Sequence, residues 1–136
     1  MELSREIRYR AYSEWSKDEI TKIKENIKQS PWHASYHIEP KTGLLNDPNG
    51  FSFFNGKFTL FYQNWPFGAA HGLKHWVHVE SDDFVHFNKT GTELLPDTKY
   101  DSHGAYSGSA YEVDGKLLLV YRGNVRDKNG RSESCQ

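Results

Sequence analysis

The segment Asn46-Asp47-Pro48-Asn49-Gly50 places a carboxylate between two amide side chains, directly before an aromatic run. Asp-Pro-Asn-Gly suits a type I turn, in which Asp comes first, Pro fixes φ at the second position and Gly comes last. The same Asp47 carboxylate could instead point into a pocket and act as a nucleophile. The segment alone favours the turn, and the chemical interpretation needs support from other residues.

Carbohydrate chemistry is the reaction class that suits the surrounding residue types. Glycoside hydrolysis needs one carboxylate beside the anomeric carbon and a second carboxyl group that protonates the leaving oxygen. Sugars are also bound by aromatic faces and by amide, carboxylate and hydroxyl side chains. Residues of these types near expected turns and strand ends are Asn46, Asp47, Gln63, Trp65, Trp76, Tyr106 and Ser107.

Other chemistries fit the sequence less well. His71, His75 and His78 share one segment, but side chains alternate along a strand, so His75 and His78 would face opposite sides and no metal site is predicted. Ser107 lacks the glycine spacing of a nucleophile elbow, which leaves it as a hydrogen-bond donor or as a polar residue at a strand start. Arg126-Asp127 is interpreted as a solvated charge pair of little energetic value.

One amphipathic helix is predicted over residues 16–29. Ser16 and Glu19 have the spacing of a capping box, and Pro31 marks the end of the helix. Ile20, Ile23 and Ile27 form one apolar stripe that docks on another element. Residues 1–31 are therefore expected to form a helical extension, and no catalytic role is expected for the helix.

After Pro31 the sequence predicts antiparallel β structure. Asn55-Gly56 and Asp114-Gly115 are strong hairpin signals, and residues 55–62 align with residues 114–121 as a partial repeat typical of propeller blades. Residues 123–136 are predicted to be a polar loop. The expected strand pairs are 50–54 with 57–62, 74–80 with 84–87, and 107–113 with 116–122.

Composition excludes several classes of protein. The chain has 136 residues and a formal net charge of −1, so no strong basic field indicates a nucleic-acid partner. Cys135 is the single cysteine and is interpreted as an ordinary thiol, which suits a reducing compartment. No secretory signal or membrane-spanning apolar run is present, so a cytoplasmic location without membrane partners is expected. The oligomeric state is left open.

Three ordered segments resemble glycoside hydrolase family 32, the β-fructofuranosidases. They are GLLNDPNGFSFFNGKFTLFYQ, HGLKHWVHVESDDFVHF and GAYSGSAY, and the similarity runs from about Trp32 to the end of the chain. The resemblance implies an all-β fold, a five-bladed β-propeller followed by a β-sandwich. Residues 32–136 would then begin the catalytic domain and supply about the first two blades, preceded by the N-terminal α-helix.

The resemblance also implies an activity and the residues that carry it. The implied reaction is retaining hydrolysis of the β-fructofuranosidic bond of sucrose 6-phosphate or sucrose, with Asp47 as the nucleophile, a small sugar or sugar phosphate as partner and no cofactor. Donors from Asn46 or backbone N–H groups should keep the pKa of Asp47 low. The implied substrate-binding residues are Leu44, Leu45, Asn46, Gln63, Trp76, Tyr106 and Ser107.

One departure from the family pattern points to a phosphorylated substrate. His71 stands where the invertase-type pattern carries a Trp, which favours the phosphosugar subgroup. Lys74 and Arg122 are further candidates for contacting a phosphate, although an ordinary surface charge is the favoured interpretation of each of the three.

Two family motifs have no match in the chain. Arg126-Asp127 is followed by Lys128 rather than Pro, and Glu133-Ser134-Cys135 does not match the Glu-Cys motif that carries the acid/base. The chain is therefore expected to be part of a longer enzyme and to hydrolyse no fructoside by itself. The alternatives are an invertase or fructan hydrolase of the same family, and a sugar-binding module without catalytic activity.

Overall fold

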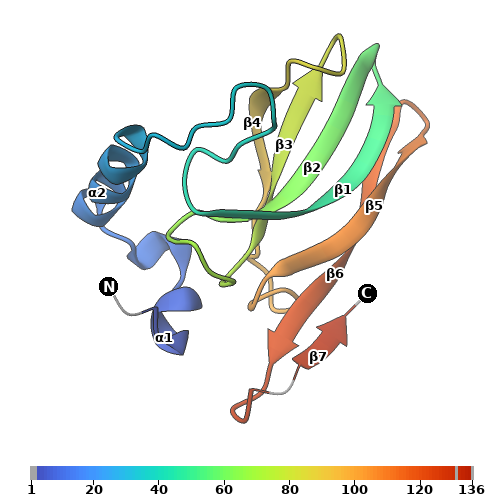
Figure 1. Cartoon of the computed structure of the whole chain (residues 1–136). Coiled ribbons are helices and arrows are strands. Elements are labelled where there is room, and N and C mark those ends of the chain that lie inside the picture. Colours follow the sequence, from blue (N-terminus) through green and yellow to red (C-terminus); the bar gives the residue numbers. More distant parts are fainter. Residues whose placement is uncertain (1–2, 131, 136) are drawn as a thin grey trace.

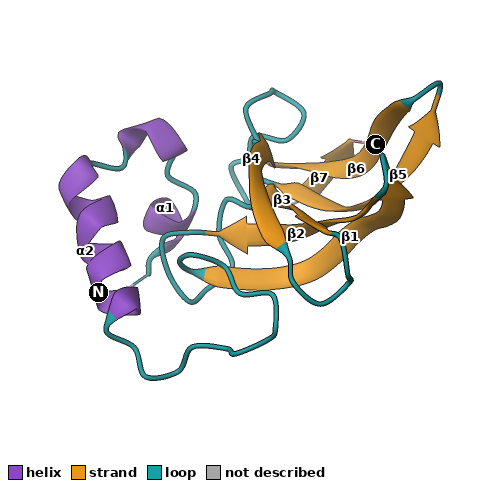
Figure 2. Ribbon diagram, turned by 90° about the horizontal axis from the view of Figure 1, so that it is seen from above, coloured by secondary structure: helices purple, strands orange, loops and turns teal. Residues whose placement is uncertain are grey.

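Two antiparallel β-sheets form the body of the protein, with helices packed at one side (Figures 1 and 2). This computed structural model describes residues 3–130 and 132–135, the last four by their backbone only. The expectations for the side chains of Glu133 and Cys135 therefore lie outside the described residues. The first sheet has the order β1-β2-β3-β4 and the second the order β5-β6-β7. The strands are β1 (Leu44–Phe54), β2 (Lys57–Trp65), β3 (His75–Ser81), β4 (Asn88–Leu94), β5 (Ala105–Val113), β6 (Lys116–Arg126) and β7 (Ser132–Cys135).

Both predicted Xaa-Gly hairpins are confirmed. Asn55 and Gly56 join β1 to β2 with φ values of 50° and 78°, and Asp114 and Gly115 join β5 to β6 with φ values of 50° and 71°. Two consecutive residues with positive φ are what a type I′ hairpin turn requires. The partial repeat thus corresponds to the turn and second strand of each hairpin.

Two predictions about β structure are wrong. Residues 84–87 form a loop rather than a strand, because Phe84 has φ 63° and Asp83 Oδ1 accepts hydrogen bonds from the backbone N–H groups of Val85 (2.9 Å) and His86 (2.8 Å). The partner of β3 is instead β4, a mostly exposed polar strand without an apolar alternation. The expected C-terminal loop contains the end of β6 and all of β7, which pair with each other as antiparallel strands.

The N-terminal segment contains α1 (Arg5–Arg8), a 3₁₀ turn η1 (Tyr12–Glu14) and α2 (Lys17–Lys28). The predicted capping box of α2 is confirmed: the Ser16 hydroxyl accepts from the Glu19 backbone N–H, and the Glu19 carboxylate accepts from the Ser16 backbone N–H. Ile20 and Ile23 pack on a cluster formed by the buried residues Trp15, Trp65 and Leu73. The segment is thereby fixed to the end of β2. Within the described residues, no helix is long and apolar enough to cross a membrane.

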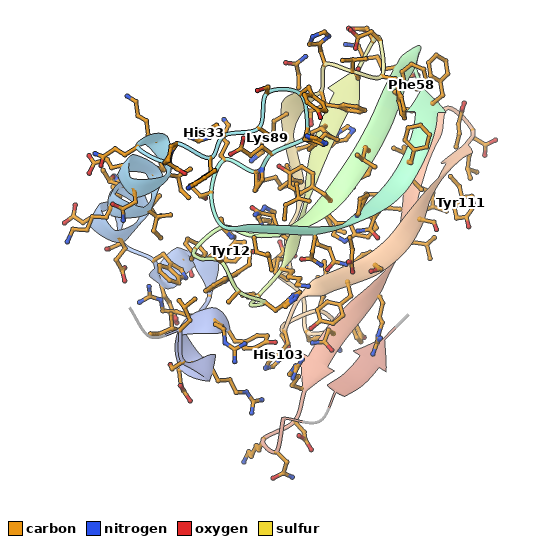
Figure 3. The ribbon with its side chains drawn as sticks, in the orientation of Figure 1. Tyr12, His33, Phe58, Lys89, His103 and Tyr111 are labelled. Atoms are coloured by element: carbon orange, nitrogen blue, oxygen red, sulfur yellow. The ribbon has the colours of Figure 1, made fainter. Side chains whose placement is uncertain are left out.

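A second apolar cluster joins the two sheets. Phe61 of β2, Trp76 of β3 and Ala105 of β5 are buried together, and Leu117 and Leu119 of β6 pack against them. Gly50 permits this close approach of β1 to β5, because its φ is 57° and a Cβ there would lie 3.0 Å from the Cβ of Ala110. Phe58 and Tyr111 lie toward the turn ends of the two hairpins, whereas Tyr12 and His103 lie toward the opposite end (Figure 3).

Candidate active site

Asp47 lies within β1 at a break in its pairing with β2, so the interpretation of residues 47–50 as a turn is wrong. The register shifts between Asn46 and Pro48, and Asp47 has φ 40°, an unusual value for a residue with a side chain. Pro48 has no N–H to donate to the ladder. The Asn49 side chain supports the bulge by donating to the Asp47 carbonyl at 2.6 Å. The Asp47 residue is left exposed while Asn49 is buried.

A chain of hydrogen bonds supports the Asp47 carboxylate. Ser107 Oγ donates to Asp47 Oδ2 at 3.0 Å, and Gln63 Nε2 donates to Ser107 Oγ at 2.9 Å. The Oε1 of Gln63 accepts from Asn46 Nδ2 at 3.1 Å and from Lys74 Nζ at 3.2 Å. Gln63 and Lys74 are buried, with exposed fractions of 1% and 7%. Each hydrogen bond from Lys74 through Gln63 and Ser107 is donated toward Asp47, whose ionised carboxylate can only accept.

The pKa of Asp47 is below its ordinary value. A side-chain hydrogen bond from Asn46 is the largest cause, and the Ser107 hydroxyl also lowers the pKa, while partial burial raises it. The charges of Lys74 and His71 lower it further. The lowered pKa agrees with the expectation that Asn46 helps to keep this acid ionised, which stays a prediction.

The core positions β5 so that Ser107 reaches Asp47. Trp76 is fully buried, and its Nε1 donates to the Tyr106 carbonyl at 3.1 Å. The Gly108 N–H donates to Asn49 Oδ1 at 3.1 Å, which ties the bulge of β1 to the start of β5. Three strands therefore fix the position of one hydroxyl.

Asp47 opens into a cleft of about 480 Å³ that also receives side chains from the N-terminal segment and from the end of β6. Of the predicted site residues, Gln63 and Tyr106 line this cleft with Asp47, and Asn46 and Ser107 reach it through the hydrogen bonds above. The lining residues are Arg5, Arg8, Tyr9, Asp47, Gln63, His71, Lys74, Tyr106, Arg126, Asn129 and Gly130.

Three predicted substrate-binding residues lie elsewhere. Leu45 packs on a cluster of Tyr62, Val77 and Val79, and the Leu44 carbonyl accepts a hydrogen bond from Asn64 at 2.9 Å. Trp76 belongs to the core between the sheets. A direct contact of these three residues with a substrate stays a prediction.

Several lining residues were missed by the sequence reasoning. Arg126 is not part of a solvated pair: its guanidinium lies 5.4 Å from the centroid of the Tyr9 ring, and its Nε is buried. Arg5, Arg8 and Tyr9 belong to the extension, for which no role in the site was expected. The basic run Arg5 to Arg10 was the available signal, but nothing local connects it to Asp47.

Of the phosphate candidates, His71 and Lys74 line the cleft and Arg122 does not.

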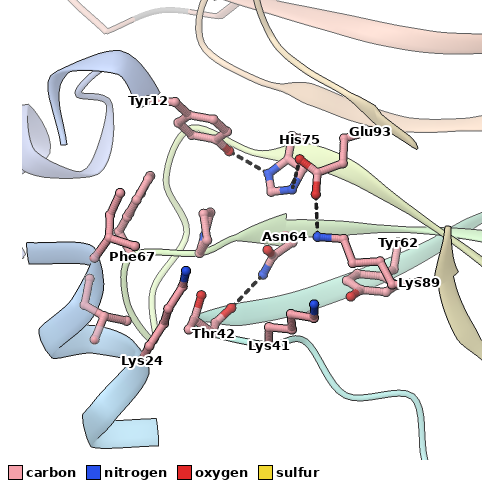
Figure 4. Close-up of a pocket in the computed structure, with 13 residues that line it drawn as sticks. Tyr12, Lys24, Lys41, Thr42, Tyr62, Asn64, Phe67, His75, Lys89 and Glu93 are labelled. Carbon is pink, nitrogen blue, oxygen red and sulfur yellow. Dashed lines mark hydrogen bonds and ion pairs between the residues drawn. The ribbon is translucent and has the colours of Figure 1, made fainter. Parts of the chain in front are cut away.

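A second polar pocket of about 350 Å³ lies between α2 and the first sheet (Figure 4). Glu93 forms an ion pair with Lys89, and its carboxylate lies 3.7 Å from Nε2 of His75. Nδ1 of His75 is 2.8 Å from the Tyr12 hydroxyl. Burial lowers the pKa of His75 to about 4, so at neutral pH its contact with Glu93 is not an ion pair.

The histidines do not combine into one site. His78 stacks on Phe61 with ring centroids 4.5 Å apart, away from the hydroxyl that contacts His75. Among the residues that the structure describes, no group of three or more His, Cys, Asp and Glu side chains is arranged to hold a metal ion.

Comparisons with known proteins agree with this geometry. The family model of the glycosyl hydrolases family 32 N-terminal domain matches residues 37–136. The chain is 70% identical to a sucrose-6-phosphate hydrolase from Streptococcus mutans over 129 residues, which are 95% of this chain and 27% of that protein. It is similar to the solved sucrose-6-phosphate hydrolase of Lactobacillus gasseri, with 47% identity, a TM-score of 0.91 and coverage of 98% of this chain and 27% of that one.

A more distant structure contains a sugar. A mutant of a Bombyx mori family 32 β-fructofuranosidase, solved in complex with sucrose, matches 87% of this chain and 25% of its own with a TM-score of 0.70 and 33% identity. The chain spans about a quarter of the length of the curated relatives that it matches. With the family model covering most of its length, the chain belongs to glycoside hydrolase family 32.

Proposed function

We propose that this chain supplies the nucleophile and part of the substrate cleft of a retaining β-fructofuranosidase that cleaves sucrose 6-phosphate. Its two sheets would be the first two blades of a five-bladed propeller completed by a longer chain. The single observation that carries the proposal is the Asp47 carboxylate, which is exposed at a strained bulge and has its pKa lowered by hydrogen bonds from Asn46 and Ser107. Strained backbone at a polar cleft is characteristic of functional sites.

The reaction follows from the position of that carboxylate. An Asp47 oxygen would attack the anomeric carbon of the fructosyl group, and the bond from that carbon to the glucosyl oxygen would break. The leaving oxygen would take a proton from a general acid, and water would then hydrolyse the fructosyl ester with retention. Asp47 is the sole carboxylate among the described residues that line the cleft, so the acid must come from elsewhere.

The choice of a phosphorylated substrate rests on the charge of the cleft. Three arginines and Lys74 line it together with one carboxylate, an arrangement that suits an anionic sugar. Two proteins to which the chain is similar in sequence, with 70% and 54% identity, carry the name sucrose-6-phosphate hydrolase. An invertase or fructan hydrolase is the alternative within the family, since structures of a fructan 1-exohydrolase and of a β-fructofuranosidase are also similar to the chain.

The test compares sucrose 6-phosphate, sucrose and a fructan as substrates of the full-length protein. A higher kcat/KM for sucrose 6-phosphate is expected, and in added methanol the product should be the methyl β-fructofuranoside, since a covalent intermediate implies retention. Preference for the unphosphorylated sugars would favour the invertase alternative. Sugar binding without turnover would indicate a sugar-binding module and contradict the proposed function.

A further inference from the structure

The cleft has a second half, built from parts of the chain that lie far from Asp47 in sequence. Arg5 and Arg8 come from α1, and Arg126 comes from the end of β6. These three residues, here the arginine cluster, line the same cleft as Asp47. The three guanidinium groups make this part of the cleft strongly positive.

The arginine cluster is held in place by contacts that leave its charge uncompensated. Arg8 Nη1 donates to the His71 carbonyl at 3.2 Å, and the Arg8 carbonyl accepts from the Leu73 N–H at 2.7 Å. The Arg5 guanidinium lies against Gly130, where an added Cβ would be 2.7 Å from Nη1. These partners are carbonyls and close-packed backbone, none of them anionic.

Arg126 is oriented by two tyrosines. Its guanidinium packs over the Tyr9 ring, and a hydrogen bond with the Tyr106 side chain raises the pKa of Arg126. Tyr106 is also the neighbour of Ser107, which donates to Asp47. Arg126 is therefore connected through Tyr106 to Ser107, the residue that donates a hydrogen bond to Asp47.

Within the described part of the chain, no ion pair joins these three arginines to a carboxylate. The Nε atoms of Arg8 and Arg126 are buried without a hydrogen-bond partner. Buried donors without partners are rare, and each calls for a ligand or water that completes it. The Nε of Arg10, in the same segment, is also buried without a partner, but the Arg10 guanidinium already pairs with Glu19 at 2.8 Å.

We propose that the arginine cluster binds the phosphate group of the sugar phosphate while Asp47 faces its fructosyl carbon. This inference rests on the proposed function and names its specificity-determining residues. Planar guanidinium groups match phosphate oxygens with paired hydrogen bonds, which ammonium groups cannot do. Lys74 has a different task, because its ammonium is buried and donates to Gln63 in the network behind Asp47.

The test measures kcat/KM of the full-length protein for sucrose 6-phosphate and for sucrose, at one fixed ionic strength. The variants are Arg8→Gln and Arg126→Gln, with Arg8→Lys as the conservative change. Lys116→Gln is the charge-matched control, since Lys116 is exposed at the start of β6. Inhibition by glucose 6-phosphate, set against inhibition by glucose, gives a binding readout that does not depend on turnover.

Each Gln variant should lower the ratio of kcat/KM for sucrose 6-phosphate over sucrose by about 10- to 100-fold, the effect of a charge-assisted hydrogen bond. Arg8→Lys should give an intermediate ratio, Lys116→Gln an unchanged one, and inhibition by glucose 6-phosphate should weaken in parallel. An unchanged ratio, or equal losses on both substrates, would overturn the inference while leaving the proposed function intact. A wild-type protein that cleaves neither substrate would instead refute the proposed function.

Discussion

Two polar pockets of the described chain, one lined by Glu93 and one by Asp47, differ in how the carboxylate is paired. Glu93 is matched by Lys89, and the residues beside it bond to one another: His75 with Tyr12, and Asn64 with two backbone carbonyls (Figure 4). Asp47 receives neutral donors, and the nearby arginine cluster has no carboxylate partner within the described chain. Within the described chain, Glu93 therefore has a cationic partner, whereas the arginines beside Asp47 form no ion pair with a carboxylate.

The largest expected effect is the loss of activity on removing the Asp47 charge. In the full-length protein, Asp47→Asn should lower kcat by several orders of magnitude, because no attacking group remains, while Asn tolerates the positive φ at this position. Glu93→Gln removes a carboxylate from the other pocket and should keep kcat near its original value. Initial rates on sucrose 6-phosphate measure both, and near-normal turnover by a purified Asp47→Asn variant would rule out this nucleophile.

A smaller effect is expected from removing the donor to Asp47. Ser107→Ala takes away one hydrogen bond to the ionised carboxylate, so kcat/KM should fall by about tenfold. The pKa of Asp47 should rise, and the acidic limb of the pH profile of kcat/KM should move to higher pH. Ser109→Ala, in the same strand, is the matched control. An acidic limb that stays in place would show that Ser107 does not act on Asp47.

Changes in the Glu93 pocket should affect the free energy of unfolding rather than the rate of catalysis. His75 has a pKa of about 4 in the folded protein against an ordinary value of 6.5, so between these values the unfolded chain binds more protons. Stability should therefore decrease as the pH falls from about 6.5 to about 4, by roughly 3 kcal/mol from this one group.

His78 and His103 also have pKa values lowered by burial and add a dependence of the same sign. The informative measurement is therefore the difference between the wild type and His75→Gln in denaturant unfolding at several pH values. The variant should show a flatter dependence. Parallel curves for the two proteins would mean that the pKa of His75 is the same in the folded and the unfolded protein.

The smallest effect should follow from breaking the ion pair at the rim of the Glu93 pocket. Lys89 is 30% exposed, so Lys89→Gln should cost less than about 1 kcal/mol of stability, as exposed ion pairs generally do. It should also raise the pKa of His75, whose protonated form Lys89 repels. Thermal unfolding and an NMR titration of His75 measure the two changes, and any loss of kcat/KM would mean that this pocket takes part in catalysis after all.

Some elements were predictable because their signals are local. The Ser16–Glu19 capping box and the Xaa-Gly turns each act within a few residues, and the structure has both where they were expected. The failures have equally specific causes. Residues 84–87 look apolar enough for a strand, yet the Asp83 carboxylate caps a loop there, and β7 depends on pairing with β6 rather than on its own pattern.

The sequence by itself determined the family and the hairpins and predicted Asp47 as the nucleophile, because a motif and a turn are carried by neighbouring residues. It could not determine that Asp47 lies on a bulge or that Trp76 packs in the core between the sheets. It also could not determine that Arg5, Arg8 and Arg126 line the same cleft. Those relations join residues up to about 120 positions apart. Only the packing of α1 and β6 around the ends of two sheets brings them together, since such contacts leave no periodicity or spacing in the chain.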